Sequence, residues 1–92
     1  MTSRTVTVAN QLGMHARAAA KFVQLAGRFQ SRILVSRQAR EADGKSIMGL
    51  LLLAAACGTV VIIAADGSDE HAAVDALADL VTSGFGENAC SV

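Results

Sequence analysis

The segment TVVIIAADGSDEHAAVDALADLV, residues 59–81, carries the strongest secondary-structure signal in the chain. Its first part, Thr59–Ala65, contains five consecutive β-branched residues and predicts a strand. Asp66-Gly67 predicts a turn, and Ser68 is expected to cap the helix that follows. The apolar residues of that helix recur at helical spacing and are Val74, Leu77 and Val81. The segment therefore predicts a strand, a tight turn and an amphipathic helix.

The rest of the chain supplies three more strands and two more helices. The expected strands are Thr5–Ala9, Arg32–Ser36 and Arg40–Ala42, and the expected helices are Ala16 to Gly27 and Ser46 to Leu53. The order βαββαβα predicts an α+β domain, with an antiparallel sheet covered by three helices on one face and open to solvent on the other. Residues 1–92 are predicted to form one domain with a core at about residues 4–84. Residues 85–92 show no pattern and are expected to form a loosely held tail.

The composition excludes several classes of protein. Eight basic and eight acidic residues balance to a net charge of zero, whereas nucleic-acid binders usually carry a basic excess. The longest uncharged stretch, Ser46–Ala65, contains helix and turn signals and does not predict membrane insertion. Cys57 and Cys90 are too few to indicate a disulfide framework, so a cytoplasmic location is expected. Cys57 is interpreted as a small buried residue.

Residues 13–17, GMHAR, lie where a glycine turn meets the start of a helix. The first amides of a helix have no partner within it, and together with the helix dipole they attract phosphate. Arg17 adds a planar cation. The same positive field is expected to favour the neutral His15 imidazole, in which a ring nitrogen can attack phosphorus. The alternative is that His15 is a surface residue or a simple cap.

The segment KSIMGL, residues 45–50, predicts a second notable helix start, with Ser46 as its N-cap. A helix this short cannot bury all of its apolar residues. If Leu50 and Leu53 face the core, then Ile47, Met48 and Leu51 remain partly exposed. Exposed apolar residues of this kind indicate a surface for a partner protein. A helix that is sunk more deeply into the domain is the alternative.

On these two motifs the chain resembles HPr, the histidine-containing phosphocarrier of the bacterial phosphoenolpyruvate-dependent phosphotransferase system. The resemblance implies an open-faced β-sandwich with four antiparallel strands and three helices on one face. It implies that His15 accepts a phosphoryl group through Nδ1 from phosphorylated Enzyme I, with help from Arg17, and passes it to a histidine of an Enzyme IIA domain. Such a protein is a carrier that is consumed and regenerated, not an enzyme, and needs no cofactor or metal.

The resemblance also implies regulation and a docking surface. In some bacteria an HPr kinase/phosphorylase modifies the serine that matches Ser46, which weakens partner binding. Partners of the family dock with acidic surfaces, which suits the basic face of the first helix. The predicted partner-binding residues are Ala16, Ala20, Lys21, Gln24, Arg28, Ile47, Met48 and Leu51. The protein is expected to be a monomer.

Two residues of this chain are unusual, and alternative functions remain open. The family usually has proline after the arginine, and this chain has Ala18, which loosens the first turn of the helix. Gly49 lies inside a predicted helix, at a cost of about 1 kcal/mol relative to alanine. A regulatory carrier of the nitrogen-related phosphotransferase branch is one alternative, and a module that kept the fold but lost transfer is another.

A metal site is poorly supported because His71 and the cysteines lack ligand spacing.

Overall fold

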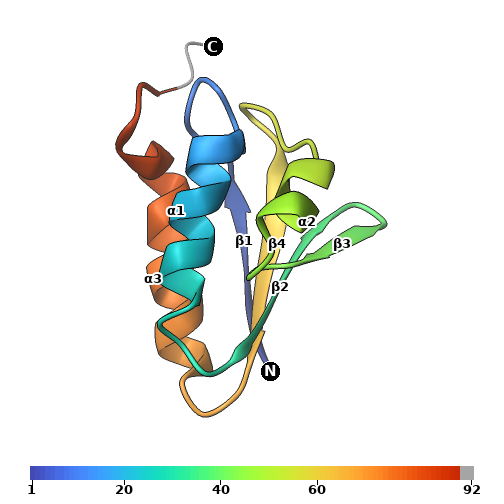
Figure 1. Ribbon diagram of the computed structural model, residues 1–92, viewed down its shortest axis with the longest axis vertical. Coiled ribbons are helices and arrows are strands. Elements are labelled where there is room, and N and C mark those ends of the chain that lie inside the picture. The colour runs from blue at the N-terminus through green and yellow to red at the C-terminus, as the bar shows by residue number, and fades with distance from the viewer. Residues whose placement is uncertain (90–92) are drawn as a thin grey trace.

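The computed structural model describes residues 1–89 and contains one four-stranded antiparallel sheet covered by helices (Figure 1). The strands are β1 (Thr2–Thr7), β2 (Arg32–Arg37), β3 (Arg40–Asp43) and β4 (Val60–Asp66). The helices are α1 (Ala16–Ala26), α2 (Ile47–Leu52), α3 (Glu70–Thr82) and the short 3-10 helix η1 (Gly84–Gly86). The predicted order of strands and helices is confirmed, with strand ends shifted by one to three residues.

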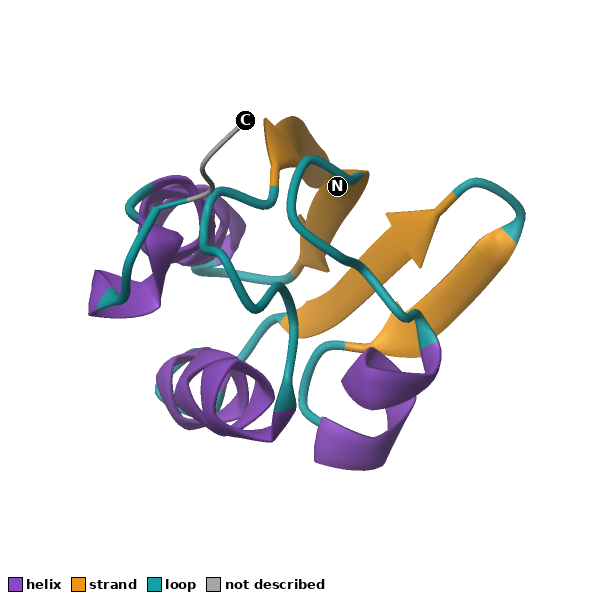
Figure 2. Cartoon of the chain, turned by 90° about the horizontal axis from the view of Figure 1, so that it is seen from above, coloured by secondary structure: helices purple, strands orange, loops and turns teal. Residues whose placement is uncertain are grey.

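The sheet has the order β1-β4-β2-β3, so β4 lies in its interior between β1 and β2. Val61 pairs with Val6 of β1, and Ile63 pairs with Val35 of β2. These four side chains are buried under the helices, because successive residues of a strand point to opposite faces. On the other face Val60 and Ile62 of the same strand are 54% and 44% exposed. The helices thus lie on one side of the sheet (Figure 2).

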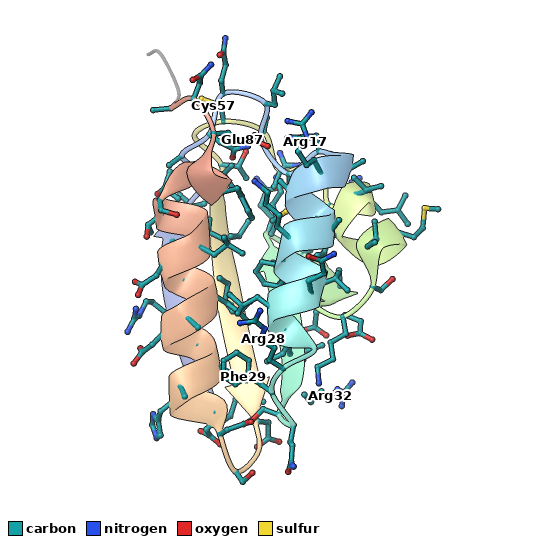
Figure 3. The ribbon with its side chains drawn as sticks, turned by 60° about the vertical axis from the view of Figure 1, so that its left-hand side comes forward. Arg17, Arg28, Phe29, Arg32, Cys57 and Glu87 are labelled. Atoms are coloured by element: carbon teal, nitrogen blue, oxygen red, sulfur yellow. The ribbon has the colours of Figure 1, made fainter. Side chains whose placement is uncertain are left out.

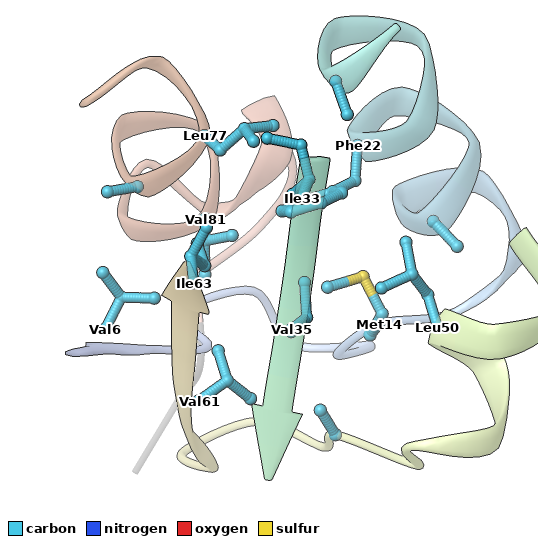
Figure 4. Close-up of a cluster of buried hydrophobic side chains, with 14 of the residues drawn as sticks. Val6, Met14, Phe22, Ile33, Val35, Leu50, Val61, Ile63, Leu77 and Val81 are labelled. Carbon is cyan, nitrogen blue, oxygen red and sulfur yellow. The ribbon is translucent and has the colours of Figure 1, made fainter. Parts of the chain in front are cut away.

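The core fills the space between the sheet and the helices (Figure 4). Its largest buried side chains include Phe22, Ile33, Leu50, Ile63, Leu77 and Phe85. Buried alanines on α1 and α3, among them Ala19 and Ala73, let these helices lie close to their neighbours. An aromatic-poor sequence therefore still forms a continuous core, with small side chains where the helices are in contact.

The start of α3 differs from the prediction. Asp69, not Ser68, is the N-cap residue, and its side chain does not bond to the helix it precedes. Instead its carboxylate accepts hydrogen bonds from the amides of Gln30 and Ser31, at 2.8 and 3.0 Å, and from the Ser31 hydroxyl. The hydroxyl bond is the main cause that lowers the pKa of Asp69, followed by the Gln30 amide. The side chain therefore joins α3 to the loop before β2.

Residues 85–89, expected to be loosely held, are packed against the domain. Phe85 is 1% exposed, although its φ of +57° is unusual for a bulky residue. Its flanking glycines, Gly84 and Gly86, also have positive φ, at 75° and 73°. The Asn88 carbonyl accepts a hydrogen bond from the Gln11 amide at 2.8 Å. The prediction of a loose tail is wrong for these residues, because a buried aromatic ring anchors a segment that has no periodic pattern. Residues 90–92 lie outside the described part of the chain.

The interpretation of Cys57 as a buried apolar residue is also wrong. Cys57 is partly exposed and disulfide-bonded. It lies at the same end of the molecule as Arg17 (Figure 3). The only other cysteine in the sequence is Cys90, which is outside the described residues.

Candidate functional site

His15 is the N-cap residue of α1. Its backbone is extended (φ −82°, ψ −179°), and its carbonyl accepts the first helical hydrogen bond, from Ala19 at 2.8 Å. Its ring nitrogen Nδ1 accepts a hydrogen bond from the Arg17 amide at 3.3 Å. The side chain is 23% exposed, so the ring is not buried in the core, and the contact with the Arg17 amide orients it toward the opening turn. The histidine thus caps the helix with the nitrogen that faces its free amides.

The turn before His15 requires a glycine. Gly13 has a φ of +68°, and a Cβ there would lie 2.7 Å from the Ala55 carbonyl oxygen and 2.8 Å from Ala56 Cα. The next residue, Met14, is 5% exposed and fixes the turn to the core. Its amide donates to the same Ala55 carbonyl at 2.9 Å. The segment between α2 and β4 therefore determines where α1 begins.

The other ring nitrogen of His15 faces Glu87, from the segment after η1. His15 Nε2 lies 3.0 Å from both carboxylate oxygens of Glu87. The Asn10 side-chain amide donates to Glu87 Oε1 at 3.1 Å and to the Gly13 carbonyl at 2.7 Å. Arg17 Nη1 lies 3.6 Å from Glu87 Oε2, and Figure 3 shows the two residues at one end of the molecule. Both nitrogens of the ring therefore have partners.

The contacts of Glu87 stabilise its ionised form. The hydrogen bond with His15 is the main cause that lowers its pKa, followed by the hydrogen bond from Asn10, while partial burial acts in the opposite direction. The positive charge of Arg17 adds a smaller contribution in the same direction as the hydrogen bonds. A carboxylate with a lowered pKa is ionised near neutral pH. The site thus brings an imidazole and a guanidinium into contact with one carboxylate.

Glu87 was not among the predicted site residues. It lies 72 residues after His15, in a segment with neither helical nor strand periodicity. A signal was nevertheless present in the preceding Gly84-Phe85-Gly86. An aromatic residue between two glycines, in an otherwise small and polar tail, indicates a specific turn with a buried ring.

The predicted basic face of α1 is only partly present. Arg17 is 69% exposed, and Gln24 is also exposed. Lys21 is half-buried, because its ammonium group donates to the Phe85 carbonyl at 2.7 Å. Arg28 lies beyond the end of the helix at Ala26, far from Arg17 along the axis of α1 (Figure 3). The structure therefore does not place Arg28 near His15.

The predicted apolar surface lies beside α1, on α2 and the first turns of α1. Ile47 and Met48 are 43% and 66% exposed, and Leu51 is half-buried, while Leu50 packs into the core. Leu52 is 68% exposed and was not predicted as part of this surface. On α1, Ala16 is exposed and Ala20 is half-buried. Since α1 and α2 are in contact, these residues come from two neighbouring helices.

Ser46 is the N-cap residue of α2, as predicted from its position. Its hydroxyl accepts a hydrogen bond from the Gly49 amide at 3.1 Å. A Cβ at Gly49 would lie 3.3 Å from that oxygen and 3.5 Å from Ala42 Cβ. A side chain at Gly49 would thus crowd the Ser46 cap slightly and meet Ala42 at an ordinary van der Waals distance.

No group of three or more His, Cys, Asp or Glu side chains within residues 1–89 could hold a metal ion. His71 is exposed, and its Nδ1 lies 3.3 Å from the Thr2 hydroxyl. None of the helices in the same part of the chain is long and apolar enough to cross a membrane.

A protein-family model described as "PTS HPr component phosphorylation site" matches residues 2–83 of this chain. The chain belongs to the HPr family. The phosphocarrier protein HPr of Cupriavidus necator is 51% identical over 87 residues, which are 95% of this chain and 98% of that protein. HPr of Xylella fastidiosa strain Temecula1 is 49% identical over 88 residues, covering 96% of this chain and 99% of that protein.

Solved HPr structures have the same fold. HPr-C-His from Thermoanaerobacter tengcongensis superposes with a TM-score of 0.92 at 44% identity, covering 96% of this chain and 99% of that one. The predicted resemblance and the predicted α+β fold are therefore confirmed. As a member of the HPr family the protein is a phosphocarrier of the phosphotransferase system and not an enzyme.

Proposed function

We propose that His15 is the residue that carries the phosphoryl group and that Nδ1 is the atom that bonds to phosphorus. The observation that supports this is the position of Nδ1 at the opening turn of α1, 3.3 Å from the Arg17 amide. A phosphoryl group on Nδ1 comes within reach of the free amides of the first turn and of the exposed Arg17 guanidinium. Charge-assisted hydrogen bonds of this kind hold phosphate oxygens strongly.

The transfer proceeds in two displacements. The Nδ1 lone pair attacks the phosphorus of phosphorylated Enzyme I, so that the new P–N bond forms as the donor's bond to phosphorus breaks. A histidine of an Enzyme IIA domain then attacks the same phosphorus and releases His15. The Arg17 side chain is 69% exposed, so its guanidinium can interact with the charge of the phosphoryl group in both steps.

The surface formed by α1 and α2 docks both partners in turn. Its apolar part consists of Ala16, Ala20, Ile47, Met48 and Leu51, and Arg17 and Gln24 supply polar contacts. Exposed Met side chains adapt to different partners, which suits a carrier that must bind more than one protein. We expect the protein to act as a cytoplasmic monomer, since each docking event needs this surface free.

Phosphorylation with labelled phosphoenolpyruvate and Enzyme I tests the assignment. The natural protein should acquire an acid-labile, base-stable phosphate, and His15→Ala should acquire none. His71→Ala is the matched control, because His71 is the only other histidine in the chain and should leave labelling unchanged. Label that survives His15→Ala would place the phosphoryl group elsewhere. Parallel reactions with Enzyme I of the sugar and of the nitrogen-related branch decide which branch the carrier serves.

We further propose that Ser46 is a regulatory phosphorylation site. Its half-buried hydroxyl lies at the edge of the docking surface, next to the exposed Ile47 and Met48. A phosphate there adds a charge of about −1.5 to −2 beside apolar side chains and repels acidic partners. An HPr kinase with ATP should place an acid-stable phosphate on the natural protein, and none on Ser46→Ala. Labelling of both proteins alike would remove Ser46 from consideration.

A further inference from the structure

Cys57 lies in the turn between α2 and β4, at the same end of the molecule as Arg17 and Glu87 (Figure 3). It is partly exposed and disulfide-bonded. A disulfide requires a second cysteine, and the sequence contains one other, Cys90. The bond of Cys57 therefore leads to the residue that directly follows the described part of the chain.

The backbone around Cys57 is bonded to the segment before α1 on both sides of the cysteine. Ala55, two residues earlier, accepts a hydrogen bond from the Met14 amide at 2.9 Å. Gly58, the next residue, donates from its amide to the Val8 carbonyl at 2.9 Å. The turn that contains Cys57 is therefore held against the segment that leads into α1.

The end of the described chain is bonded to the same segment. The Asn88 carbonyl accepts a hydrogen bond from the Gln11 amide at 2.8 Å, and Ala89 pairs with Asn10 in an antiparallel bridge. Consecutive Cα atoms are about 3.8 Å apart, so Cys90 begins one residue from this bridge. These backbone contacts bring both cysteine-bearing segments to the stretch before α1, independently of the bond between the sulfur atoms.

We infer that Cys57 and Cys90 form a reversible disulfide that fixes the turn before His15, and that reduction of this bond loosens the turn. Only its effect on phosphoryl transfer rests on the proposed function of His15. The hydrophobic core of the described residues does not include Cys57, so packing of the core does not depend on the bond. In the cytoplasm, where glutathione and thioredoxin keep thiols reduced, disulfides are mostly transient or redox-sensing. The bond is therefore a redox-sensitive modification and not a permanent cross-link.

The disulfide forms by two exchanges with a small disulfide such as oxidised glutathione. The thiolate of one cysteine attacks a sulfur of the small disulfide, which gives a mixed disulfide and releases one small thiol. The thiolate of the second cysteine then attacks the protein sulfur of the mixed disulfide and releases the second small thiol. Two electrons and two protons pass from the protein to the small disulfide, and a dithiol reverses both steps.

Reduction leaves the end of the chain held by contacts that water can reach. Asn88 and Ala89 are both exposed, so their backbone contacts open more readily than those of buried strands. The turn before His15 then loses a fixed neighbour. A less rigid turn positions the imidazole less accurately for attack on phosphorus, which slows transfer.

Treatment with oxidised glutathione, followed by reduction with dithiothreitol, tests the inference on the natural protein. Thiol titration should find no free thiol after oxidation and two after reduction, since the chain has two cysteines. Reduction should lower the melting temperature by roughly 10 °C, because a disulfide constrains the unfolded chain. It should also speed hydrogen exchange of the Gln11 amide and slow phosphorylation by Enzyme I.

Two variants separate the disulfide from other effects of the reagents. Cys57→Ser cannot form the bond, so its melting temperature and rate should match those of the reduced natural protein and should not respond to dithiothreitol. Ala56→Ser is the matched control, because it changes the exposed neighbour in the same turn and keeps both cysteines. It should respond to reduction like the natural protein. If Cys57→Ser fails to fold, Cys90→Ser decides through the same comparison.

A disulfide-linked dimer, free thiols that persist after oxidation, or equal melting temperatures and rates in the oxidised and reduced protein would overturn the inference. Thiol counts and melting temperatures do not involve His15. Label that survives His15→Ala therefore contradicts the proposed function and leaves the disulfide standing.

Discussion

The two histidines of this chain both lie at helix starts, yet their surroundings differ. His15 is the N-cap residue of α1, whose first turn contains no acidic residue. His71 lies one residue inside α3, after Asp69 and Glu70. Glu70 accepts hydrogen bonds from the Gly67 amide and the Thr2 hydroxyl, so a carboxylate already fills the positive end of α3. A histidine at a helix start can thus serve phosphate only where the helix has left its free amides to an outside anion.

The two histidines also differ in which parts of the chain contact their side chains. Around His15 these contacts come from the turn before α1 and from the segment after α3, whereas Nδ1 of His71 lies 3.3 Å from the hydroxyl of Thr2, at the nearby end of β1. Both helix starts therefore depend on tertiary contacts, but the carboxylates at the start of α3 come from Asp69 and Glu70 themselves, whereas the carboxylate near the start of α1 comes from the segment after α3. The following predictions test that contrast, in order of decreasing effect on stability.

Phe85→Ala should have the largest effect. Replacing a fully buried phenylalanine by alanine costs about 3 to 5 kcal/mol, and it also frees the segment that holds Glu87. We expect a clearly lower melting temperature and, in the folded fraction, slower phosphorylation of His15 by Enzyme I. Denaturant unfolding and the phosphorylation assay measure these two effects. Full stability in this variant would show that residues 85–89 do not anchor the site.

Gly13→Ala should disturb the start of α1 directly. The positive φ and the close Ala55 carbonyl make the added Cβ cost about 2 kcal/mol, and the turn must shift at His15. Gly58→Ala is the matched control, because its φ is also positive but no atom lies within 4 Å of the added Cβ. The control should cost about 1 kcal/mol and leave phosphorylation unchanged. Equal loss of phosphorylation in the two variants would argue against a specific role for the Gly13 turn.

The start of α3 should contribute a stability that depends on pH. The Thr2 hydroxyl is the main cause that lowers the pKa of Glu70 from 4.5 to about 2, followed by the Gly67 amide. The folded state therefore favours the ionised form, and this contribution is fully present above about pH 4.5 and is lost as the pH falls toward 2. Glu70→Gln should lower the melting temperature at pH 7 and have less effect near pH 3. A difference that stays constant between these two pH values would contradict this assignment.

Arg17→Ala should change stability least, within about 0.5 kcal/mol, because the side chain is mostly exposed. Its effect should fall on transfer, with slower phosphorylation by Enzyme I. Arg28→Ala removes the same charge beyond the end of α1 and should leave the rate nearly unchanged. Equal loss of rate in the two variants would indicate general attraction between charged surfaces instead of a contact at the phosphoryl group.

Much of the fold could be predicted because its signals are local. Strand β4 was identified from its run of β-branched residues, and α1 from apolar residues at helical spacing ended by Gly27. Ser46 was recognised as a cap, and the exposed apolar face of α2 followed from the shortness of that helix. The cap of α3 was assigned to Ser68 and is Asp69, because both residues are good caps and only the packing against Gln30 and Ser31 distinguishes them.

The sequence alone determined the order of strands and helices, the glycine turn before His15 and the pairing of His15 with Arg17, since each depends on residues close together in the chain. Tertiary structure decided which residue faces Nε2 of the His15 ring. Its partner Glu87 is 72 residues away and is delivered by three consecutive residues with positive φ around a buried ring. Such a contact depends on the path of the whole chain, and no periodicity of side chains encodes that path.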